Sequence, residues 1–237
     1  MRKSGVLLPV FSLPGPYGIG CFSVAARKFI DFLVEAGQTY WQILPLGPTG
    51  YGDSPYQSFS TFAGNPYLID LEELIGQGLL SEGECDDADL VDDSGAVDYG
   101  KMYHARFVLL REAYSHSCAK ETEEFQAFVS KNAYWLEDYA LFMAVKDAHG
   151  GAPLHDWEEE IRLRKPEVLA ALKTTLREDV DFYKYLQFVF FRQWSELKSY
   201  ALRCSVSIIG DIPIYVSLDS ADVWANPELF ELDREGK

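Results

Sequence analysis

Three short apolar runs, each bounded by glycine or proline, lie at residues 5–10, 39–46 and 206–216. Runs of this length and composition are typical of buried strands. Between the first two runs, apolar residues recur with helical spacing, and Ser23 and Gly37 stand where an N-cap and a C-terminal glycine belong. The first part of the chain is therefore predicted to form a strand, a helix and a second strand.

The region 101–203 reads as nearly continuous helix. One helical stretch ends at paired glycines, Gly150 and Gly151. A later stretch carries large apolar residues on one face, which we interpret as core: Leu186, Val189, Phe190, Trp194 and Leu197. With the third strand following, the alternation predicts an α/β fold with a parallel sheet.

Charge narrows the classes of ligand. The formal net charge is -16, which disfavours nucleic acids and anionic membrane surfaces and suits a neutral ligand such as a sugar. Residues 81–100 hold eight acids and no base, and we interpret them as a solvated surface segment. A calcium-binding loop is the more specific alternative, but the spacing D-x-D-x-D-G that such a loop requires is absent.

The remaining composition predicts neither metals nor cofactors. Four scattered cysteines without a C-x-x-C pair indicate reduced thiols in a cytoplasmic protein. The four histidines form no metal-binding pattern, so no metal site is expected. The N-terminal stretch lacks the features of a signal peptide, and no apolar run is long enough to span a membrane.

The loop 47–57, GPTGYGDSPYQ, directly follows the second predicted strand. Parallel α/β folds place ligand sites beyond the C-terminal ends of strands. The loop carries two aromatic rings and three polar side chains: Tyr51, Tyr56, Asp53, Ser54 and Gln57. Flat rings beside polar groups suit sugars, which present C–H faces and hydroxyl rims. A purely structural loop is the alternative.

Asp211 lies in the middle or at the end of the third apolar run. An acid there would be costly to bury unpaired. It is either a hydrogen-bonded packing residue or an acid that points into a pocket. Glycosidases use carboxylates in pairs, so Asp211 alone would not be the catalytic apparatus.

Several long motifs resemble the amylomaltase family, the bacterial 4-α-glucanotransferases or disproportionating enzymes of glycoside hydrolase family 77. They are SGVLLPVFSLPGPYGIG, WQILPLGPTGYGDSPYQSFSTFAGNPYLIDL, YWLEDYALFMAVKDAHGG, FVFFRQWSELK and IIGDIPIYVSLDSADVWANPELFELDREGK. The resemblance reaches from residue 4 to residue 237 and is weak only over 81–134 and 152–180. Cys21, Thr61 and Ser217 depart from the family pattern, which has Asp, Ala and Ala.

For the fold, the resemblance implies an α/β chain forming the first three strands of a (β/α)₈ TIM barrel, with a helical insertion subdomain between the second and third strands. Residues 1–80 would begin the barrel and supply substrate-groove loops. Residues 81–180 would form the mostly helical insertion, and 181–237 would return to the barrel.

For function, the resemblance implies transfer of maltooligosyl units between α-1,4-glucans by a retaining double displacement, without cofactors. The substrate-binding residues carried over are Tyr56 at the cleavage subsite, Asp211 supporting that subsite, Ser54 on the acceptor side and Tyr51 in a secondary aromatic glucan site. Nucleic acid and membrane partners are not expected.

No catalytic residue of the family is found in this chain. The family's nucleophile, acid/base and third acid lie in R-I-D-H, A-E-D-L-G and T-H-D-N-D motifs, which do not occur here and would follow Lys237. We therefore expect the 237-residue polypeptide alone to be inactive and poorly folded, or to pair with its missing half or with itself. The alternatives are a non-catalytic glucan-binding or regulatory protein and a plain hydrolase.

Overall fold

The computed structural model describes residues 2–50, 52–92 and 95–233. The contacts between residues divide the chain into two compact units, which we describe separately. The first comprises Met1–Leu46, Asn65–Cys118 and Val189–Ile212, and the second comprises Gly47–Gly64, Ala119–Phe188 and Pro213–Lys237.

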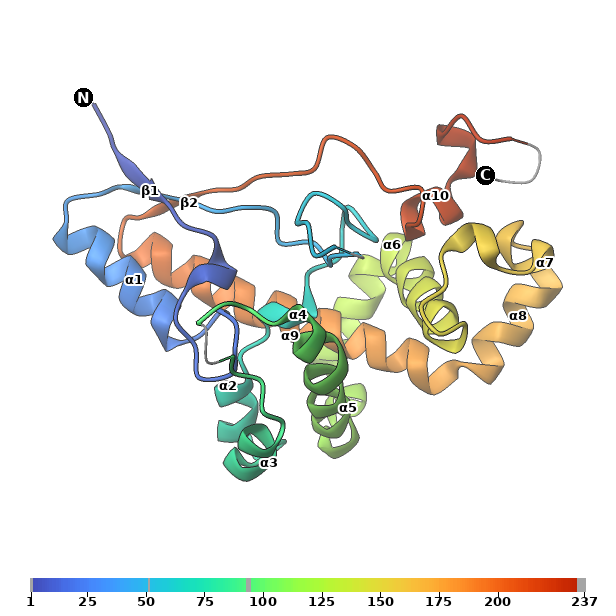
Figure 1. Ribbon diagram of the computed structural model, residues 1–237, viewed down its shortest axis with the longest axis horizontal. Coiled ribbons are helices and arrows are strands. Elements are labelled where there is room, and N and C mark those ends of the chain that lie inside the picture. Colours follow the sequence, from blue (N-terminus) through green and yellow to red (C-terminus); the bar gives the residue numbers. More distant parts are fainter. Residues whose placement is uncertain (1, 51, 93–94, 234–237) are drawn as a thin grey trace. The chain divides into compact units, whose positions relative to one another are not determined.

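The first unit contains a small sheet and several helices (Figure 1). Its strands are β1 (Gly5–Leu7), β2 (Tyr40–Gln42) and β3 (Ser207–Ile209). Its helices are α1 (Val24–Glu35), α2 (Leu71–Gly76), α3 (Glu82–Asp87), α4 (Tyr99–Lys101), α5 (Phe107–His116) and the C-terminal part of α9 (Arg177–Arg203), with a π-helical turn at Met102–Arg106 and 3-10 turns at Val10–Ser12 and Pro66–Leu68.

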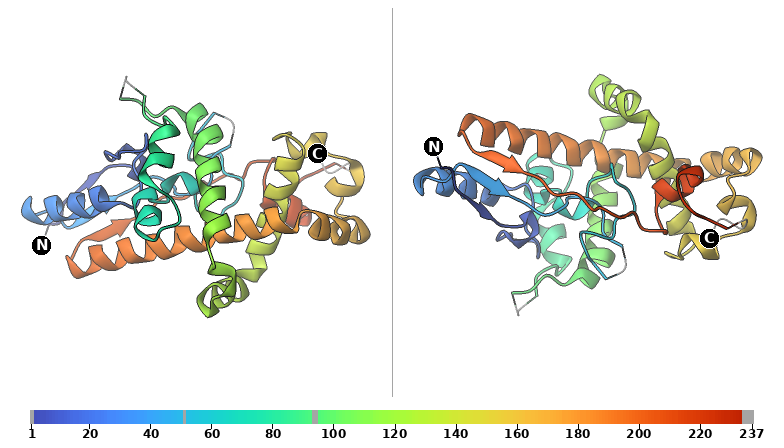
Figure 2. Two further views of the ribbon diagram at one scale, coloured as in Figure 1. Left: turned by 90° about the horizontal axis from the view of Figure 1, so that it is seen from below. Right: turned by 90° about the horizontal axis from the view of Figure 1, so that it is seen from above.

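The three strands are parallel and follow the order β1-β2-β3, which confirms the predicted parallel sheet. The α1 helix and the C-terminal part of α9 lie on one side of this sheet (Figures 1 and 2). Trp41 is buried, and its ring meets Phe29 of α1 edge to face at 5.1 Å. Helix α1 thus covers the sheet face that carries Trp41.

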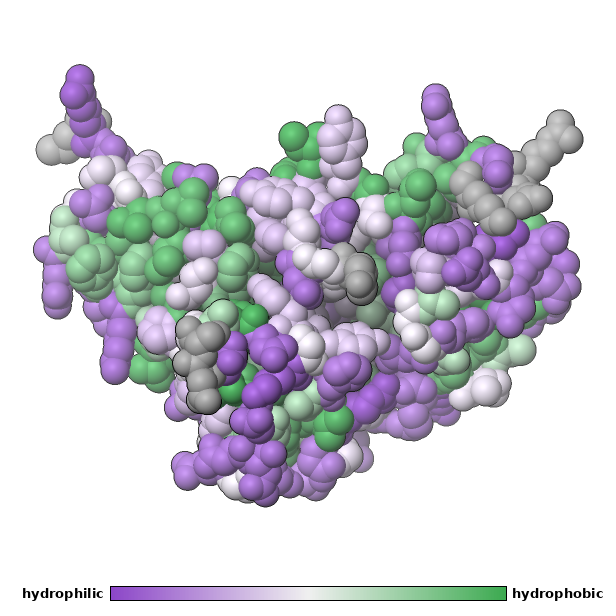
Figure 3. Space-filling view, viewed as in Figure 1, coloured by the Kyte–Doolittle hydropathy of each residue, from purple (hydrophilic) through white to green (hydrophobic). Residues whose placement is uncertain are grey.

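The opposite face of the sheet is open. Leu7, directly beside Gln42 in the register, is 54 % exposed, and Ile209 is also exposed. Hydrophobic surface also gathers over the end of this unit that carries α1 (Figure 3). The prediction of a buried strand was therefore wrong for β1, whose described residues are exposed or half-buried.

The strands are also shorter than the predicted runs 5–10, 39–46 and 206–216. A proline follows each strand within four residues: Pro9, Pro45 and Pro213. Because proline has no N–H to donate, it ends a hydrogen-bonded ladder.

Helix α1 forms as its sequence predicts. The Ser23 hydroxyl accepts a hydrogen bond from the Ala25 amide at 3.2 Å, which caps the start of the helix. Gly37 follows the end with a φ of 68°, the left-handed conformation that favours glycine. Both end signals are confirmed.

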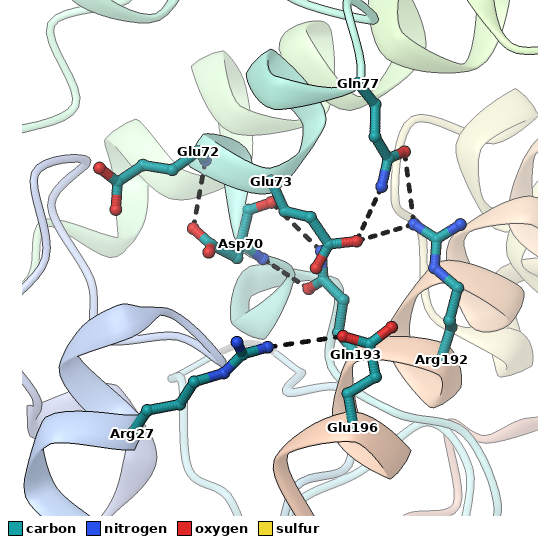
Figure 4. Close-up of polar contacts among 8 residues, drawn as sticks. All are labelled: Arg27, Asp70, Glu72, Glu73, Gln77, Arg192, Gln193 and Glu196. Atoms are coloured by element: carbon teal, nitrogen blue, oxygen red, sulfur yellow. Dashed lines mark hydrogen bonds and ion pairs between the residues drawn. The ribbon is translucent and has the colours of Figure 1, made fainter. Parts of the chain in front are cut away.

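A buried glutamine ties α9 to the segment before α2 (Figure 4). The Gln193 Oε1 accepts from the Asp70 amide at 2.7 Å, and its Nε2 donates to the Asp70 carbonyl at 3.3 Å. Asp70 in turn caps α2 through the Glu72 amide. The half-buried pair Arg192–Glu73 and the exposed pair Arg27–Glu196 lie near this contact (Figure 4). The buried pair satisfies main-chain groups that secondary structure leaves unpaired.

The second unit is helical, as predicted for most of 101–203. Its helices are α6 (Glu123–Ala148), α7 (Glu159–Arg162), α8 (Pro166–Thr175), the N-terminal part of α9 and α10 (Ala221–Ala225), with 3-10 turns at Ala119–Glu121, Leu154–Asp156 and Pro227–Leu229. Helix α6 ends just before Gly150 and Gly151, whose φ angles are 62° and 81°. This end matches the prediction.

Aromatic side chains fill the interior of the second unit. Trp157 lies 5.1 Å from Phe142 and 5.8 Å from Trp224, measured between ring centroids. Leu186 is fully buried here, and within the first unit Val189, Phe190 and Leu197 are buried too. The interpretation of that apolar face as core is confirmed for these residues.

The acidic segment is largely solvated, as predicted: most described side chains of 81–100 are exposed or half-buried, although Cys85 and Leu90 are buried. Within the described ranges, no cluster of three or more histidine, cysteine or acidic side chains could hold a metal ion. No helix in the described part of the chain has the length and apolar character needed to cross a membrane.

His149 gives the second unit a pH-dependent contact. Its Nδ1 lies 2.7 Å from the Val145 carbonyl and its Nε2 lies 2.8 Å from the Glu158 carboxylate. Only the protonated imidazole can donate at both nitrogens. Burial alone would lower the pKa of His149, but the two hydrogen bonds outweigh it and raise the pKa above its ordinary value.

Stabilisation from His149 is therefore expected to be complete below pH about 6.5 and to be lost as the pH rises through the elevated pKa. Glu158 has a lowered pKa, so its own contribution is present at neutral pH and is lost as the pH falls through that pKa. NMR titration of the histidines would test this, with exposed His155 as the reference. We expect Glu158→Gln to lower the pKa of His149, and an unchanged value would contradict the contact.

Candidate functional site

The loop Gly47–Gly64 is a closed hairpin in the second unit. Thr49 and Ser58 form an antiparallel bridge, and the Gly50 amide donates to the Gln57 carbonyl at 3.0 Å. At the tip, the Gln57 amide donates to the Ser54 carbonyl at 3.1 Å, and Asp53 adopts a φ of 55°. The hairpin explains why the sequence concentrates glycine and proline here.

Two serines hold the base of the hairpin. The Ser58 hydroxyl donates to the Ser60 carbonyl at 2.7 Å, and the Ser60 hydroxyl accepts from the Phe62 amide at 3.1 Å. A side chain at Gly47 would come within 2.8 Å of the Ser58 hydroxyl. This close approach requires glycine at position 47.

A carboxylate fastens the hairpin to α10. Asp222 accepts from the Thr61 amide at 2.8 Å and from the Thr61 hydroxyl at 2.9 Å. The Ala221 amide also donates to the Phe59 carbonyl at 2.8 Å. The hydroxyl contact depends on the threonine side chain at position 61. Sequence analysis missed Asp222, since 161 residues separate it from Thr61.

Two further buried groups support the hairpin. The Gln187 amide group pairs with the Gly64 main chain, accepting at 2.7 Å and donating at 2.9 Å. The Lys146 ammonium lies 2.6 Å from the Asp219 carboxylate and 4.9 Å from the centre of the Phe59 ring. Hydrogen bonds and a cation–π contact thus fix the hairpin on a rigid base.

The predicted substrate residues of this loop lie at its tip. Tyr56 is 46 % exposed, and its amide donates to the Ser54 hydroxyl at 3.3 Å. Burial raises the pKa of the nearby Asp53 carboxyl. Tyr51 lies outside the described residues. The structure therefore brings Tyr56 and Ser54 together on one turn.

Asp211 lies in the first unit, two residues beyond the end of β3. It is half-buried and follows the strand instead of lying within it. Of the two positions considered from the sequence, the end of the strand is the one observed. A carboxylate beyond a parallel strand occupies the usual place of a ligand-binding group in such sheets.

The chain is similar to known proteins over its whole length. Residues 8–236 match a family described as 4-alpha-glucanotransferase. The 4-alpha-glucanotransferase of Thermus thermophilus is 51% identical, over 100% of this chain and 47% of its own length. That of Clostridium butyricum is 48% identical, over 95% of this chain and 46% of its own length.

A solved structure shares the fold. Amylomaltase from Streptococcus agalactiae, in complex with acarbose, superposes with a TM-score of 0.94 at 42% identity, over 100% of this chain and 48% of that one. This chain therefore spans about half the length of the curated relatives it matches.

Proposed function

The chain belongs to the 4-alpha-glucanotransferase family, and from this premise we propose that the protein transfers maltooligosyl units between α-1,4-glucans. The observation that carries the proposal is the hairpin tip, where Tyr56 and Ser54 are held toward solvent by a rigid base. The Streptococcus agalactiae relative was solved in complex with acarbose, which supports a sugar ligand for the family.

The activity requires groups beyond those of this chain. Retaining transfer needs a nucleophile and an acid/base about 5–5.5 Å apart. The nucleophile forms a glycosyl-enzyme intermediate, and the acid/base then activates an acceptor hydroxyl in place of water. By "complete enzyme" we mean a polypeptide in which this chain is continued by a segment that carries the three acidic motifs.

Within the complete enzyme we assign substrate binding to this chain. Tyr56 and Asp211 would hold the sugar ring at the bond that breaks, Ser54 would contact the acceptor, and Tyr51 would serve a secondary glucan site. The three strands would begin a (β/α)₈ barrel, and a helical insertion would separate the second from the third. We also propose a cytoplasmic location and a role in starch or maltodextrin metabolism.

The test is disproportionation of maltotriose. The complete enzyme can be obtained by reading the source gene past codon 237 or by joining this chain to the C-terminal half of the Thermus thermophilus relative. We expect glucose together with oligomers longer than maltotriose. Glucose and maltose alone would indicate a hydrolase, and glucan binding without products would indicate a binding protein; either result would overturn the proposal.

Asp211→Asn in the complete enzyme is expected to lower kcat about tenfold, because the neutral amide cannot accept hydrogen bonds from sugar hydroxyls as strongly as a carboxylate does. The measurement is the steady-state rate on maltotriose. Asp233→Asn, in the same stretch of sequence but outside the assigned residues, serves as the control. Turnover within twofold of wild type would remove Asp211 from the site.

A further inference from the structure

Two aromatic side chains of the second unit form an exposed corner. Phe62 belongs to the hairpin and Tyr134 to α6, and they are 49 % and 72 % exposed. Their ring centroids lie 5.5 Å apart and their planes meet at 85°. Phe62 also stacks on Trp135 at 6.1 Å, with 19° between the planes. We name Phe62, Tyr134 and Trp135 the aromatic corner.

The base of the corner is fixed. Trp135 is buried, and its indole N–H donates to the Asn132 side chain at 3.3 Å. Phe62 follows Thr61, whose amide and hydroxyl are both held by Asp222. The residues next to Tyr134 and Phe62 are thus held by hydrogen bonds. The two rings remain exposed, although contact between apolar rings and water is unfavourable.

We propose that the aromatic corner binds glucose rings of an α-1,4-glucan chain, as a surface site separate from the hairpin tip; the choice of ligand rests on the proposed function. Two rings at a right angle offer flat surfaces for the C–H faces of a sugar, and the Tyr134 hydroxyl offers a polar group to its rim. Phe62 lies on the same hairpin as Tyr56, so this loop would contribute a side chain to both contacts.

Other occupants fit the surface less well. The formal charge of -16 disfavours anionic polymers. A second copy of the chain on this surface is treated as an outcome of the test.

The experiment is affinity electrophoresis of the complete enzyme in native gels that contain amylopectin. We expect Tyr134→Leu and Phe62→Leu each to weaken the apparent affinity by about fivefold, because leucine keeps apolar bulk but removes the flat ring. Tyr103→Leu is the matched control, since Tyr103 is an exposed tyrosine of the first unit. Maltotriose turnover should stay within about twofold of wild type in all three variants.

Unchanged retardation of both variants would overturn the proposal. So would sedimentation showing that wild type self-associates and that Tyr134→Leu does not. Circular dichroism of each variant identifies loss of fold, and Tyr134→Phe then replaces a misfolded variant: it keeps the ring and should retain binding. Another outcome is that the two variants lose retardation while the complete enzyme shows no transfer from maltotriose. That combination would support the aromatic corner as a glucan site and would overturn the proposed function.

Discussion

Replacing Tyr56 by alanine in the complete enzyme is expected to lower kcat at least about tenfold, which corresponds to roughly 1.4 kcal/mol of lost transition-state stabilisation. Hydrogen bonds of the hairpin hold the main chain of Tyr56 at the tip, so the position from which the side chain extends is fixed before substrate arrives. Preorganised contacts lose little entropy on binding, and they can therefore act on the transition state. The measurement is the rate of maltotriose disproportionation over a range of substrate concentrations.

The controls separate chemistry from structure. Tyr56→Phe keeps the ring and removes the hydroxyl, so a loss comparable to that of Tyr56→Ala would assign the effect to the hydroxyl. Gln57→Ala changes the exposed neighbour on the same turn and should leave kcat within about twofold of wild type. Near-normal turnover of Tyr56→Ala would remove this residue from the substrate site.

Gln193→Leu is expected to lower the free energy of unfolding by about 2–5 kcal/mol, because it leaves a buried amide and a buried carbonyl of Asp70 without partners. The measurement is thermal unfolding of the complete enzyme followed by calorimetry.

Gln77→Leu provides the matched control. Gln77 is an exposed glutamine that donates to Glu73 at 2.8 Å, and water can replace that contact. Its loss should cost less than about 1 kcal/mol. Equal Tm values for Gln193→Leu and Gln77→Leu would contradict the role of the buried pair.

Local signals in the sequence were enough to predict several elements. Ser23 and Gly37 bracket α1, and the paired glycines end α6, because caps depend on residues only a few positions away. The strand limits were predicted less well, since Pro9 and Pro45 decide where the ladder stops. Burial of the strands was overestimated, because it depends on which elements cover each face of the sheet.

The contacts that fix the candidate site had no such local signal. Gln187 lies on the apolar face of α9, yet its partner Gly64 is 123 residues away. Thr61 and Asp222 are similarly remote, so only the folded structure pairs them. The loop composition did indicate an aromatic and polar tip, and Tyr56 and Ser54 do share a turn there. Tyr134 and Phe62 were missed: both stand in the quoted motifs, but they are far apart in the sequence and only the fold brings their rings together.

The pairing of Gly64 and Asp70 with α9 also sets a schedule for folding during synthesis. Gln187 and Gln193 each follow their partners, Gly64 and Asp70, by 123 residues. The segment that holds Gly64 and Asp70 therefore leaves the ribosome long before the two glutamines are synthesised. At translation rates of roughly 5–20 residues per second, the delay is about 6–25 s. For that interval the first two strands and the hairpin have incomplete support, and a nascent chain would depend on protection such as that of chaperones to avoid misassembly.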